Sequence, residues 1–236
     1  MNILCIIPAR SGSKGIPDKN IKKFHGKPLL AWTIIQAIKC KYKMKIIVST
    51  DSNKYADIAK EYGAEVPFLR PKEISEDLST DLEFIKYTSE TLELLHKYKS
   101  DIILQLRPVT PNRSVKMINN CLDTFIKNFE EYDSLRTVIK SEKSPYKMYS
   151  IDKENNILKP LFDNINDIQE SFNQPRQILP PTYLHNGYID IIKTDILKND
   201  LISGDKIYPY IKDKSDNIDI DYEDDWKNAE KNFIPP

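Results

Sequence analysis

The chain has 236 residues, with 35 Lys plus Arg and 35 Asp plus Glu, so its formal net charge at pH 7 is zero. This balance argues against binding nucleic acid or a membrane surface through bulk electrostatics, so any basic character must be local. Hydrophobic residues make up 40% of the chain, which is enough to bury one large core, and we expect a single domain over residues 1–236. No run approaches the roughly 18 apolar residues of a membrane-spanning helix, so no membrane partner is expected.

Strand and helix patterns alternate through the first two thirds of the chain. A continuous apolar run predicts a strand over 3–8 that is buried on both faces. The further predicted strands are 45–49, 66–69, 101–106 and 134–139, and the predicted helices are 29–39, 54–62, 81–98 and one capped by Ser114. This order predicts an α/β fold with a mainly parallel, three-layer, Rossmann-like sheet.

The last third of the chain is less regular. Residues 141–185 are rich in proline and contain few long periodic runs, so we expect them to leave the core sheet as a small β-arm. Such an arm cannot easily bury its own faces, so a homodimer would give it a partner. The chain is then predicted to return as a strand over 187–192, an extended segment over 216–221 and a helix over 222–231.

The chain has three cysteines, and they are scattered through apolar patterns. They are Cys5, Cys40 and Cys121, an odd number without metal-ligand spacing. We therefore predict buried thiols in a reducing cytoplasm, since structural disulfides belong to oxidising compartments.

The first predicted strand runs into a loop that concentrates cationic and small polar side chains. These are Arg10, Ser11, Ser13, Lys14, Lys19 and Asn20, punctuated by glycine and proline. Glycine lets backbone amides approach phosphate oxygens, and Arg and Lys add charge-assisted hydrogen bonds. Because open α/β sheets bind ligands at the carboxyl ends of their strands, we predict that this loop binds a polyanion such as a nucleoside triphosphate.

Two familiar phosphate motifs are excluded by spacing. A Walker-type loop needs Gly-Lys-Ser/Thr leading directly into a helix, whereas Gly15 is followed by Ile-Pro and the next helix is predicted only at Leu29. Gly12-Ser-Lys-Gly15 also lacks the Gly-x-Gly-x-x-Gly dinucleotide fingerprint. Taken alone, Gly12-Ser-Lys-Gly15 is far more typical of a surface turn than of a phosphate site.

A second chemical feature is Asp219-Ile-Asp221. In a strand, residues two apart point to the same side, so both carboxylates can meet one cation, and hard oxygen ligands suit Mg²⁺. The surrounding run 213–225 is acidic throughout, which also fits a solvated surface. Asp224 and Asp225 are better explained by favourable charge at a helix start.

Several motifs follow one another in a recognisable order. They are the segment 8–20, Val48-Ser-Thr-Asp51, Arg70-Pro71, Asp77-Leu-Ser-Thr80, the segment 107–113, Gln174-Pro-Arg-Gln177, Asn186-Gly187 and Asp219-Ile-Asp221. Over nearly the whole chain this pattern resembles the acylneuraminate cytidylyltransferases, the CMP-sialic acid synthetase family. The resemblance implies a nucleotidyltransferase fold, a homodimer, and transfer of CMP from CTP to the anomeric hydroxyl of a nonulosonic (sialic-acid-like) sugar acid, with release of pyrophosphate.

The nucleotide site that follows combines the basic loop with later motifs. Arg10, Lys14 and Lys19 are expected to act catalytically by holding the triphosphate, with Ser11 and Ser13 beside them. The resemblance implies that Asn20 and Arg70 read the pyrimidine edge and that Ser79 or Thr80 completes this pocket. Agreement with the family's metal aspartates strengthens the prediction of Mg²⁺ at Asp219 and Asp221.

The acceptor site departs from the family pattern. Arg107 stands where sialic acid enzymes usually carry Gln, and Leu184 replaces an Arg expected to pair with the sugar carboxylate. Arg107 either takes over that pairing or braces its own loop. The remaining expected acceptor residues are Lys147, Arg176, Gln177, Tyr183 and Asn186. We therefore expect a legionaminic, pseudaminic or other modified acid at least as readily as N-acetylneuraminic acid.

Two other classes of function share part of this pattern. A nucleotidyltransferase for another nucleotide or acceptor would keep the basic loop and the paired aspartates. A non-catalytic nucleotide-binding module would need the loop but not Asp219 and Asp221. Since both aspartates are present, the sequence favours an enzyme.

Overall fold

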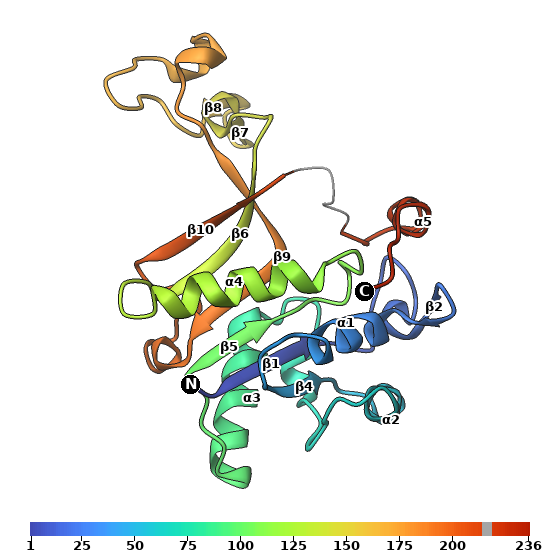
Figure 1. Cartoon of the computed structure of the whole chain (residues 1–236). Helices are drawn as coiled ribbons and strands as arrows, with labels where there is room; N and C mark the ends of the chain where they lie inside the picture. The colour runs from blue at the N-terminus through green and yellow to red at the C-terminus, as the bar shows by residue number, and fades with distance from the viewer. Residues whose placement is uncertain (214–218) are drawn as a thin grey trace.

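A six-stranded sheet forms the centre of the computed structural model, which describes residues 1–213 and 219–236 (Figure 1). The order across the sheet is β10 (Ile207–Lys212), β6 (Ser134–Lys140), β9 (Tyr183–Lys193), β5 (Ile102–Gln105), β1 (Ile3–Pro8) and β4 (Lys45–Ser49). Strand β9 runs antiparallel to both of its neighbours, and the other neighbouring pairs are parallel. The predicted mainly parallel sheet is confirmed.

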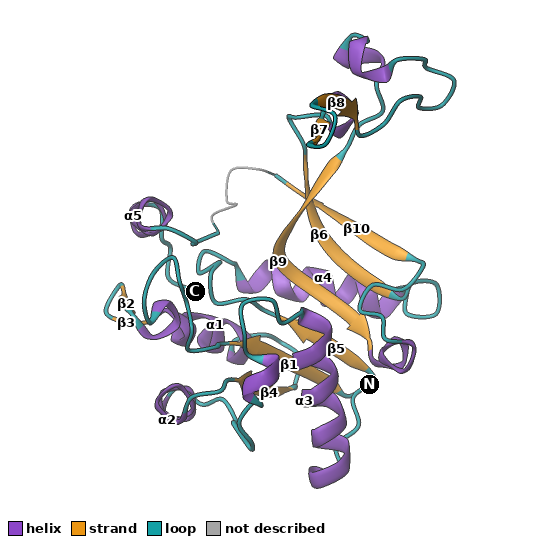
Figure 2. Cartoon of the chain, turned by 180° about the vertical axis from the view of Figure 1, so that it is seen from behind, coloured by secondary structure: helices purple, strands orange, loops and turns teal. Residues whose placement is uncertain are grey.

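Helices cover both faces of the sheet and give the predicted three layers (Figure 2). Side chains of β1 alternate between the two cores, as the period of two in a strand requires. Cys5 and Ile7 pack in one core with α1 (Leu29–Ile38), α2 (Asn53–Glu61) and α4 (Val115–Lys127). Leu4 and Ile6 pack in the other core with α3 (Asp81–His96). A third apolar cluster joins α5 (Glu223–Lys231) to the hairpin of β2 (Lys23–Phe24) and β3 (Lys27–Pro28).

Local capping chemistry explains where two of the helices begin. The Thr80 hydroxyl accepts a hydrogen bond from the Glu83 amide at 3.3 Å, and the Glu83 carboxylate accepts one from the Thr80 amide at 2.5 Å, a reciprocal capping box. Ser114 caps α4 by accepting from the Met117 amide at 3.2 Å, as the sequence predicts.

Two strand predictions need correction. The segment 66–69 forms no strand, and only Glu65 makes an isolated bridge to Ile47. Pro67 has no amide proton, so this segment cannot continue a ladder beyond that bridge. Strand β10 was not predicted from the sequence; it contains Pro209, which its edge position tolerates. Strand β9 also begins at Tyr183, earlier than the predicted 187.

Only part of the predicted extended segment 216–221 lies in the described residues. Residues 216–218 lie outside the described residues, and Asp219 to Asp221 belong to no strand. In the described residues no helix is both long and apolar enough to cross a membrane. The predicted burial of the thiols is confirmed for Cys5 and Cys121, whereas Cys40 is half-buried, and all three are free.

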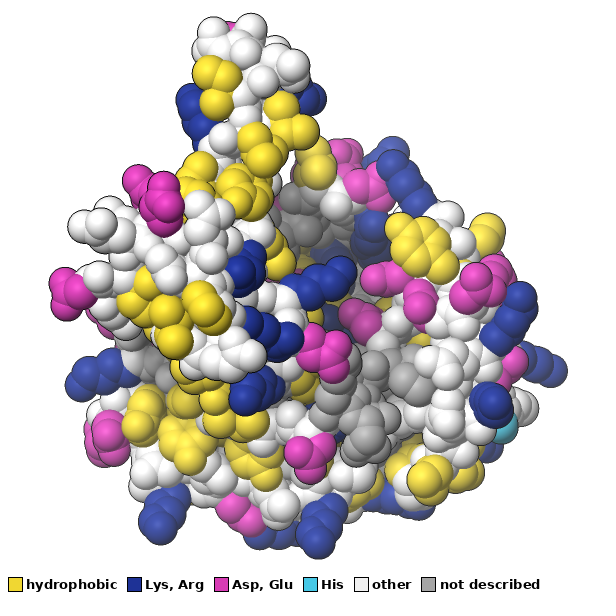
Figure 3. Space-filling model, turned by 90° about the horizontal axis from the view of Figure 1, so that it is seen from above, with side chains coloured by type: hydrophobic (Ala, Val, Ile, Leu, Met, Phe, Trp, Pro, Cys, Tyr) yellow, Lys and Arg dark blue, Asp and Glu magenta, His cyan; other side chains and the backbone are white. Residues whose placement is uncertain are grey.

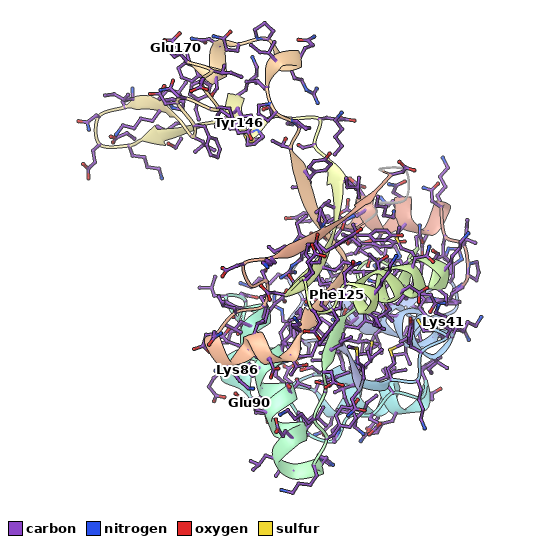
Figure 4. All side chains as sticks on the ribbon, turned by 60° about the vertical axis from the view of Figure 1, so that its left-hand side comes forward. Lys41, Lys86, Glu90, Phe125, Tyr146 and Glu170 are labelled. Atoms are coloured by element: carbon purple, nitrogen blue, oxygen red, sulfur yellow. The ribbon has the colours of Figure 1, made fainter. Side chains whose placement is uncertain are left out.

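A β-arm rises from the ends of β6 and β9, as predicted for this region (Figure 1). Its hairpin pairs β7 (Tyr149–Asp152) with β8 (Ile157–Pro160). Figure 4 shows Tyr146 and Glu170 on the arm, well away from Phe125 in the body. Three hairpin side chains remain largely exposed, namely Ile151 at 65%, Ile157 at 50% and Leu158 at 59%. The arm therefore leaves an apolar surface that the chain alone does not bury.

Candidate active site

A cavity of about 550 Å³ opens beyond the carboxyl end of β1. Its walls come from five parts of the chain: the loop after β1, Arg70, the segment 76–84, the segment 107–109 and residues 221–222. The face seen in Figure 3 is hollowed near its middle, where basic and acidic side chains gather. The structure thus brings together the following predicted residues: Arg10, Ser13, Lys14, Lys19, Asn20, Arg70, Ser79, Arg107 and Asp221.

The loop after β1 is fixed by hydrogen bonds to the end of β4 and to itself. The Ser11 amide and hydroxyl both donate to the Asp51 carboxylate, at 2.8 and 2.7 Å. Asn20 Nδ2 donates to the Arg10 carbonyl at 3.2 Å. Ser11 therefore anchors the loop and does not line the cavity, while its neighbour Arg10 does.

Arg10 and Lys14 share one carboxylate. Arg10 Nη1 lies 2.8 Å from Asp77 Oδ1, and Lys14 Nζ pairs with the other oxygen of Asp77. Hydrogen bonds from Lys14 and Arg10 hold the pKa of Asp77 below its ordinary value. Two cations predicted to hold phosphate are thus already paired with an acidic side chain of the protein.

Lys19 joins the basic loop to the acidic segment near the C-terminus. Its Nζ donates to the Ile220 carbonyl at 2.5 Å and to Asp221 Oδ1 at 3.1 Å, and the side chain is only 12% exposed. Gly15 permits this close approach, because a Cβ at that position would clash with the Asp221 carbonyl oxygen.

Asp219 and Asp221 form an acidic pair beside this lysine. Desolvation and, after it, the charge of Asp221 raise the pKa of Asp219 to about 6, against the opposing charges of Lys19 and Arg107. Among the described residues no group of three or more His, Cys, Asp or Glu side chains is arranged to hold a metal. Asp219 and Asp221 supply carboxylate oxygens, the ligand type that Mg²⁺ takes alongside water and substrate oxygens, but they would not complete a metal site by themselves.

Two of the predicted base-reading residues, Asn20 and Arg70, are buried. Arg70 is 6% exposed, and its guanidinium donates to the Ser49 hydroxyl at 3.1 Å and to the Ser49 carbonyl at 2.7 Å. Its burial lowers the pKa of Arg70 to about 10. Ser79 lines the cavity, whereas the Thr80 hydroxyl is used to cap α3.

Arg107 is embedded in an ionic network that the sequence analysis missed. Its guanidinium pairs with Asp81, with Asp190 at 2.5 Å and with the Gly187 carbonyl at 3.2 Å. Asp190 is fully buried and also accepts from Arg136 at 3.0 Å and His185 at 2.8 Å.

Burial alone would raise the pKa of Asp190, but the hydrogen bond from His185 and the charges of Arg107 and Arg136 bring it well below its ordinary value. The carboxylates of Asp81 and Asp190 already neutralise the charge of Arg107. The arrangement therefore favours the alternative in which Arg107 braces its own loop over the one in which it pairs with the sugar carboxylate. The one sequence signal for this network was Asp190 itself, an acidic residue inside the otherwise apolar predicted strand 187–192.

Asn186 lies in a bulge of the β6–β9 ladder. The register shifts between Arg136 and Val138, and the Thr137 hydroxyl fills the gap by donating to Asn186 Oδ1 at 2.8 Å and accepting from the Ile189 amide at 3.0 Å. Asn186 Nδ2 is buried and has no hydrogen-bond partner among the described residues. Bulges of this kind often re-aim side chains beside active sites.

The other predicted acceptor residues are not brought to this cavity within one chain. Tyr183 begins β9 at the base of the arm. Lys147 donates to the Phe172 carbonyl at 3.4 Å, and Arg176 donates to the Ser141 carbonyl at 3.2 Å. Arg176 and Gln177 line a second cavity that shares no lining residue with the first. They are carried by the arm, which extends away from the body.

The sheet, the loop after β1 and the paired aspartates define a nucleotidyltransferase-like α/β protein. Residues 4–229 match the model of the family described as cytidylyltransferase, so the chain belongs to the cytidylyltransferase family. The resemblance found in the sequence motifs is confirmed.

Two relatives and one solved structure illustrate the match. The chain is 34% identical to a CMP-N,N'-diacetyllegionaminic acid synthase of Legionella pneumophila, over 98% of this chain and 96% of the relative. It is also 34% identical to an N-acylneuraminate cytidylyltransferase of Escherichia coli, over 96% of this chain but 51% of that longer protein. A structure of CMP:2-keto-3-deoxy-manno-octonic acid synthetase complexed with CTP superposes with a TM-score of 0.70 over 98% of both chains, at 14% identity, which shows the shared fold.

Proposed function

We propose that this protein transfers CMP from CTP to the anomeric hydroxyl of a nonulosonic acid and releases pyrophosphate. One observation carries the proposal: Arg10, Lys14, Lys19 and Asp221 surround one cavity at the carboxyl end of β1, in a member of the cytidylyltransferase family. Two relatives, a CMP-N,N'-diacetyllegionaminic acid synthase and an N-acylneuraminate cytidylyltransferase, support the acceptor class by their names.

Nucleotidyl transfer mainly requires orientation and charge neutralisation. The acceptor hydroxyl attacks the α-phosphorus and pyrophosphate leaves in line. Arg10, Lys14 and Lys19 would bind the triphosphate, while Asn20 and Arg70 would read the cytosine edge with Ser79 beside them. A buried base edge left unpaired is costly, and this cost would exclude purine nucleotides.

We propose Mg²⁺ as the cofactor, held by Asp219 and Asp221. Desolvation and, after it, the charge of Asp221 raise the pKa of Asp219, and a bound cation would offset both effects. A bound Mg²⁺ would supply further neutralisation of phosphate charge and a lower pKa for the attacking hydroxyl. Lys19 would keep its contact with Asp221 and so tie the phosphate-binding loop to the metal ligands.

We further propose that the protein is a homodimer and works in the cytoplasm. The exposed apolar hairpin of the arm supports a homodimer, and a second copy would bring Lys147, Arg176 and Gln177 of one arm to a partner's site. Three free thiols support a reducing compartment, proposed to be the cytoplasm. Burial also raises the pKa of Cys40 to about 11 and of Cys121 to about 12, which keeps them unreactive.

The proposal is tested by pyrophosphate release with CTP and Mg²⁺ across a panel of legionaminic, pseudaminic and N-acetylneuraminic acids. ATP, GTP and UTP serve as parallel controls. We expect release only with CTP and a nonulosonic acid. If CTP binds and no acid in the panel gives release, the proposed transfer reaction is wrong.

A further inference from the structure

Asp77 lies on the segment 75–80, which connects a one-turn helix to α3. Its carboxylate spans the two cations of the basic loop, at 2.8 Å from Arg10 Nη1 and in an ion pair with Lys14 Nζ. Arg10 and Lys14 line the cavity, and so does Ser79, two residues beyond Asp77. A carboxylate of the protein therefore occupies an anion position at the mouth of the candidate triphosphate site.

Little besides these two ion pairs holds the tip of the segment 75–80 to the basic loop. Its own turn is closed by hydrogen bonds from the Ser79 amide to the Glu76 carbonyl at 3.2 Å and from the Glu76 amide to the Ser79 hydroxyl at 2.9 Å. Leu78 is 93% exposed, so the tip adds almost no buried apolar surface. Across the described residues, the ion pairs of Asp77 are the polar contacts between this segment and residues 9–20.

These pairs are of the kind that a polyphosphate can replace. The side chains of Asp77 and Lys14 are 36% and 80% exposed, so solvent screens their attraction. A triphosphate carries several negative charges and more acceptor oxygens than one carboxylate, and Arg in particular binds phosphate through paired hydrogen bonds. If Arg10 and Lys14 bind the triphosphate, it has to displace Asp77 from them, and this displacement lowers the apparent affinity for the triphosphate.

We propose that Asp77 is a built-in competitor for the triphosphate, and that phosphate oxygens release the segment 75–80 by taking its place between Arg10 and Lys14. The proposal rests on the proposed function in taking a nucleoside triphosphate as the ligand. Because Ser79 belongs to the same tight turn, release of Asp77 also repositions Ser79 in the cavity wall. The competition thereby couples occupation of the phosphate site to the shape of the nucleotide pocket.

The test measures binding of inorganic tripolyphosphate and of CTP by calorimetry, without turnover. Asp77→Asn and, as a second variant, Asp77→Ser should bind both ligands about two- to tenfold more tightly than the wild type. Glu73→Gln is the matched control, because it removes the same charge from the neighbouring one-turn helix (Lys72–Ile74), and Glu73 forms no ion pair with Arg10 or Lys14 among the described residues. Its affinity should stay within twofold of the wild type, and Asp77→Glu should also remain close to it.

Equal or weaker binding by both Asp77 variants overturns the proposal and makes Asp77 a residue that positions the two cations. If the wild type binds tripolyphosphate but not CTP, the proposed function fails while the competition is still judged from tripolyphosphate. If neither the wild type nor the variants bind tripolyphosphate, the competition is wrong. In turnover, Asp77→Asn should lower KM for CTP without raising kcat.

Discussion

At the scale of single residues, a substitution of Lys19 distinguishes most clearly between an effect on catalysis and an effect on folding. Its Nζ contacts the Ile220 carbonyl and Asp221 beside the cavity. Lys19→Ala should reduce the rate of pyrophosphate release about 10²–10³-fold, because it removes charge aimed at the phosphates. Lys22→Ala is the matched control, since Lys22 also pairs with an acidic residue near the C-terminus, Glu223 at 2.8 Å, but does not line the cavity.

Thermal unfolding measured alongside turnover keeps the two effects apart. Both lysine variants should unfold within a few degrees of the wild type, and Lys22→Ala should keep nearly full activity. A folded Lys19→Ala protein with wild-type turnover would show that this residue has no catalytic part.

The buried carboxylate of Asp190 predicts a specific dependence of stability on pH. Its pKa is lower in the folded chain than in the unfolded chain, so its stabilising effect is complete above the unfolded value of about 4 and is lost as the pH falls below it. Asp190→Asn should lower the free energy of unfolding at pH 7 by roughly 3–5 kcal/mol, since Arg107 and Arg136 lose a buried partner. The difference from the wild type should shrink between pH 5 and 2.

Chemical denaturation at several pH values measures this effect. Asp195→Asn serves as the control, because Asp195 pairs with Lys198 at 2.7 Å on the surface and should matter much less. A constant difference between wild type and Asp190→Asn across the pH range would contradict the assignment of the charged form to Asp190.

Residues differ in how far sequence alone can place them. Arg10, Lys14 and Lys19 were predictable, because they follow a recognisable buried strand and the end of such a strand is a ligand site. The partners of Asp190 were not predictable, since Arg136 and Arg107 come from separate parts of the sheet. Only the pairing of strands brings these three side chains together.

At the scale of elements, the contact between the basic loop and residues 219–222 depends on Gly15. A methyl group there would meet the Asp221 carbonyl oxygen, whereas a Cβ at Gly12 would have nothing within 4 Å. Gly15→Ala should therefore push the two segments apart and lower kcat/KM at least about tenfold, with a loss of roughly 1–3 kcal/mol in stability. Gly12→Ala should behave like the wild type in both measurements. Similar activities for the two variants would show that the close approach is not needed.

The starts of helices depend on local contacts that the sequence reveals, whereas the formation of a strand depends on its neighbours in the folded sheet. Thr80 and Ser114 start helices through bonds to residues three positions on, which sequence reveals. Strand β10 depends on its edge position, where Pro209 costs no ladder bond, and the segment 66–69 fails as a strand because Pro67 cannot donate. Both outcomes are decided by the neighbours that a segment finds in the sheet.

At the scale of the whole molecule, alternation of strands and helices was enough to predict the layered sheet, but not where the arm points. Residues 141–185 contain few long periodic runs, so the sequence holds no pattern from which the direction of the arm could be predicted. The arm projects away from the body (Figure 4), and Lys147 and Arg176, which belong to the arm, do not line the first cavity. The proposed homodimer would use both the apolar hairpin and these cations.

This assembly is testable on the hairpin itself. Leu158 is 59% exposed on β8, and Leu95 is 63% exposed on α3, so the two positions are matched in side chain and exposure. If the arm is the interface, the wild type should sediment at twice its 27.5 kDa mass, and Leu158→Lys should shift it toward the monomer, because a charge opposes burial of the hairpin. Leu95→Lys should remain dimeric.

Leu158→Lys should still bind CTP but lose most acceptor-dependent turnover, since the nucleotide cavity lies within one chain while the arm residues would serve the partner. A monomeric wild type with full turnover would refute the shared site, and a dimeric Leu158→Lys would place the interface elsewhere.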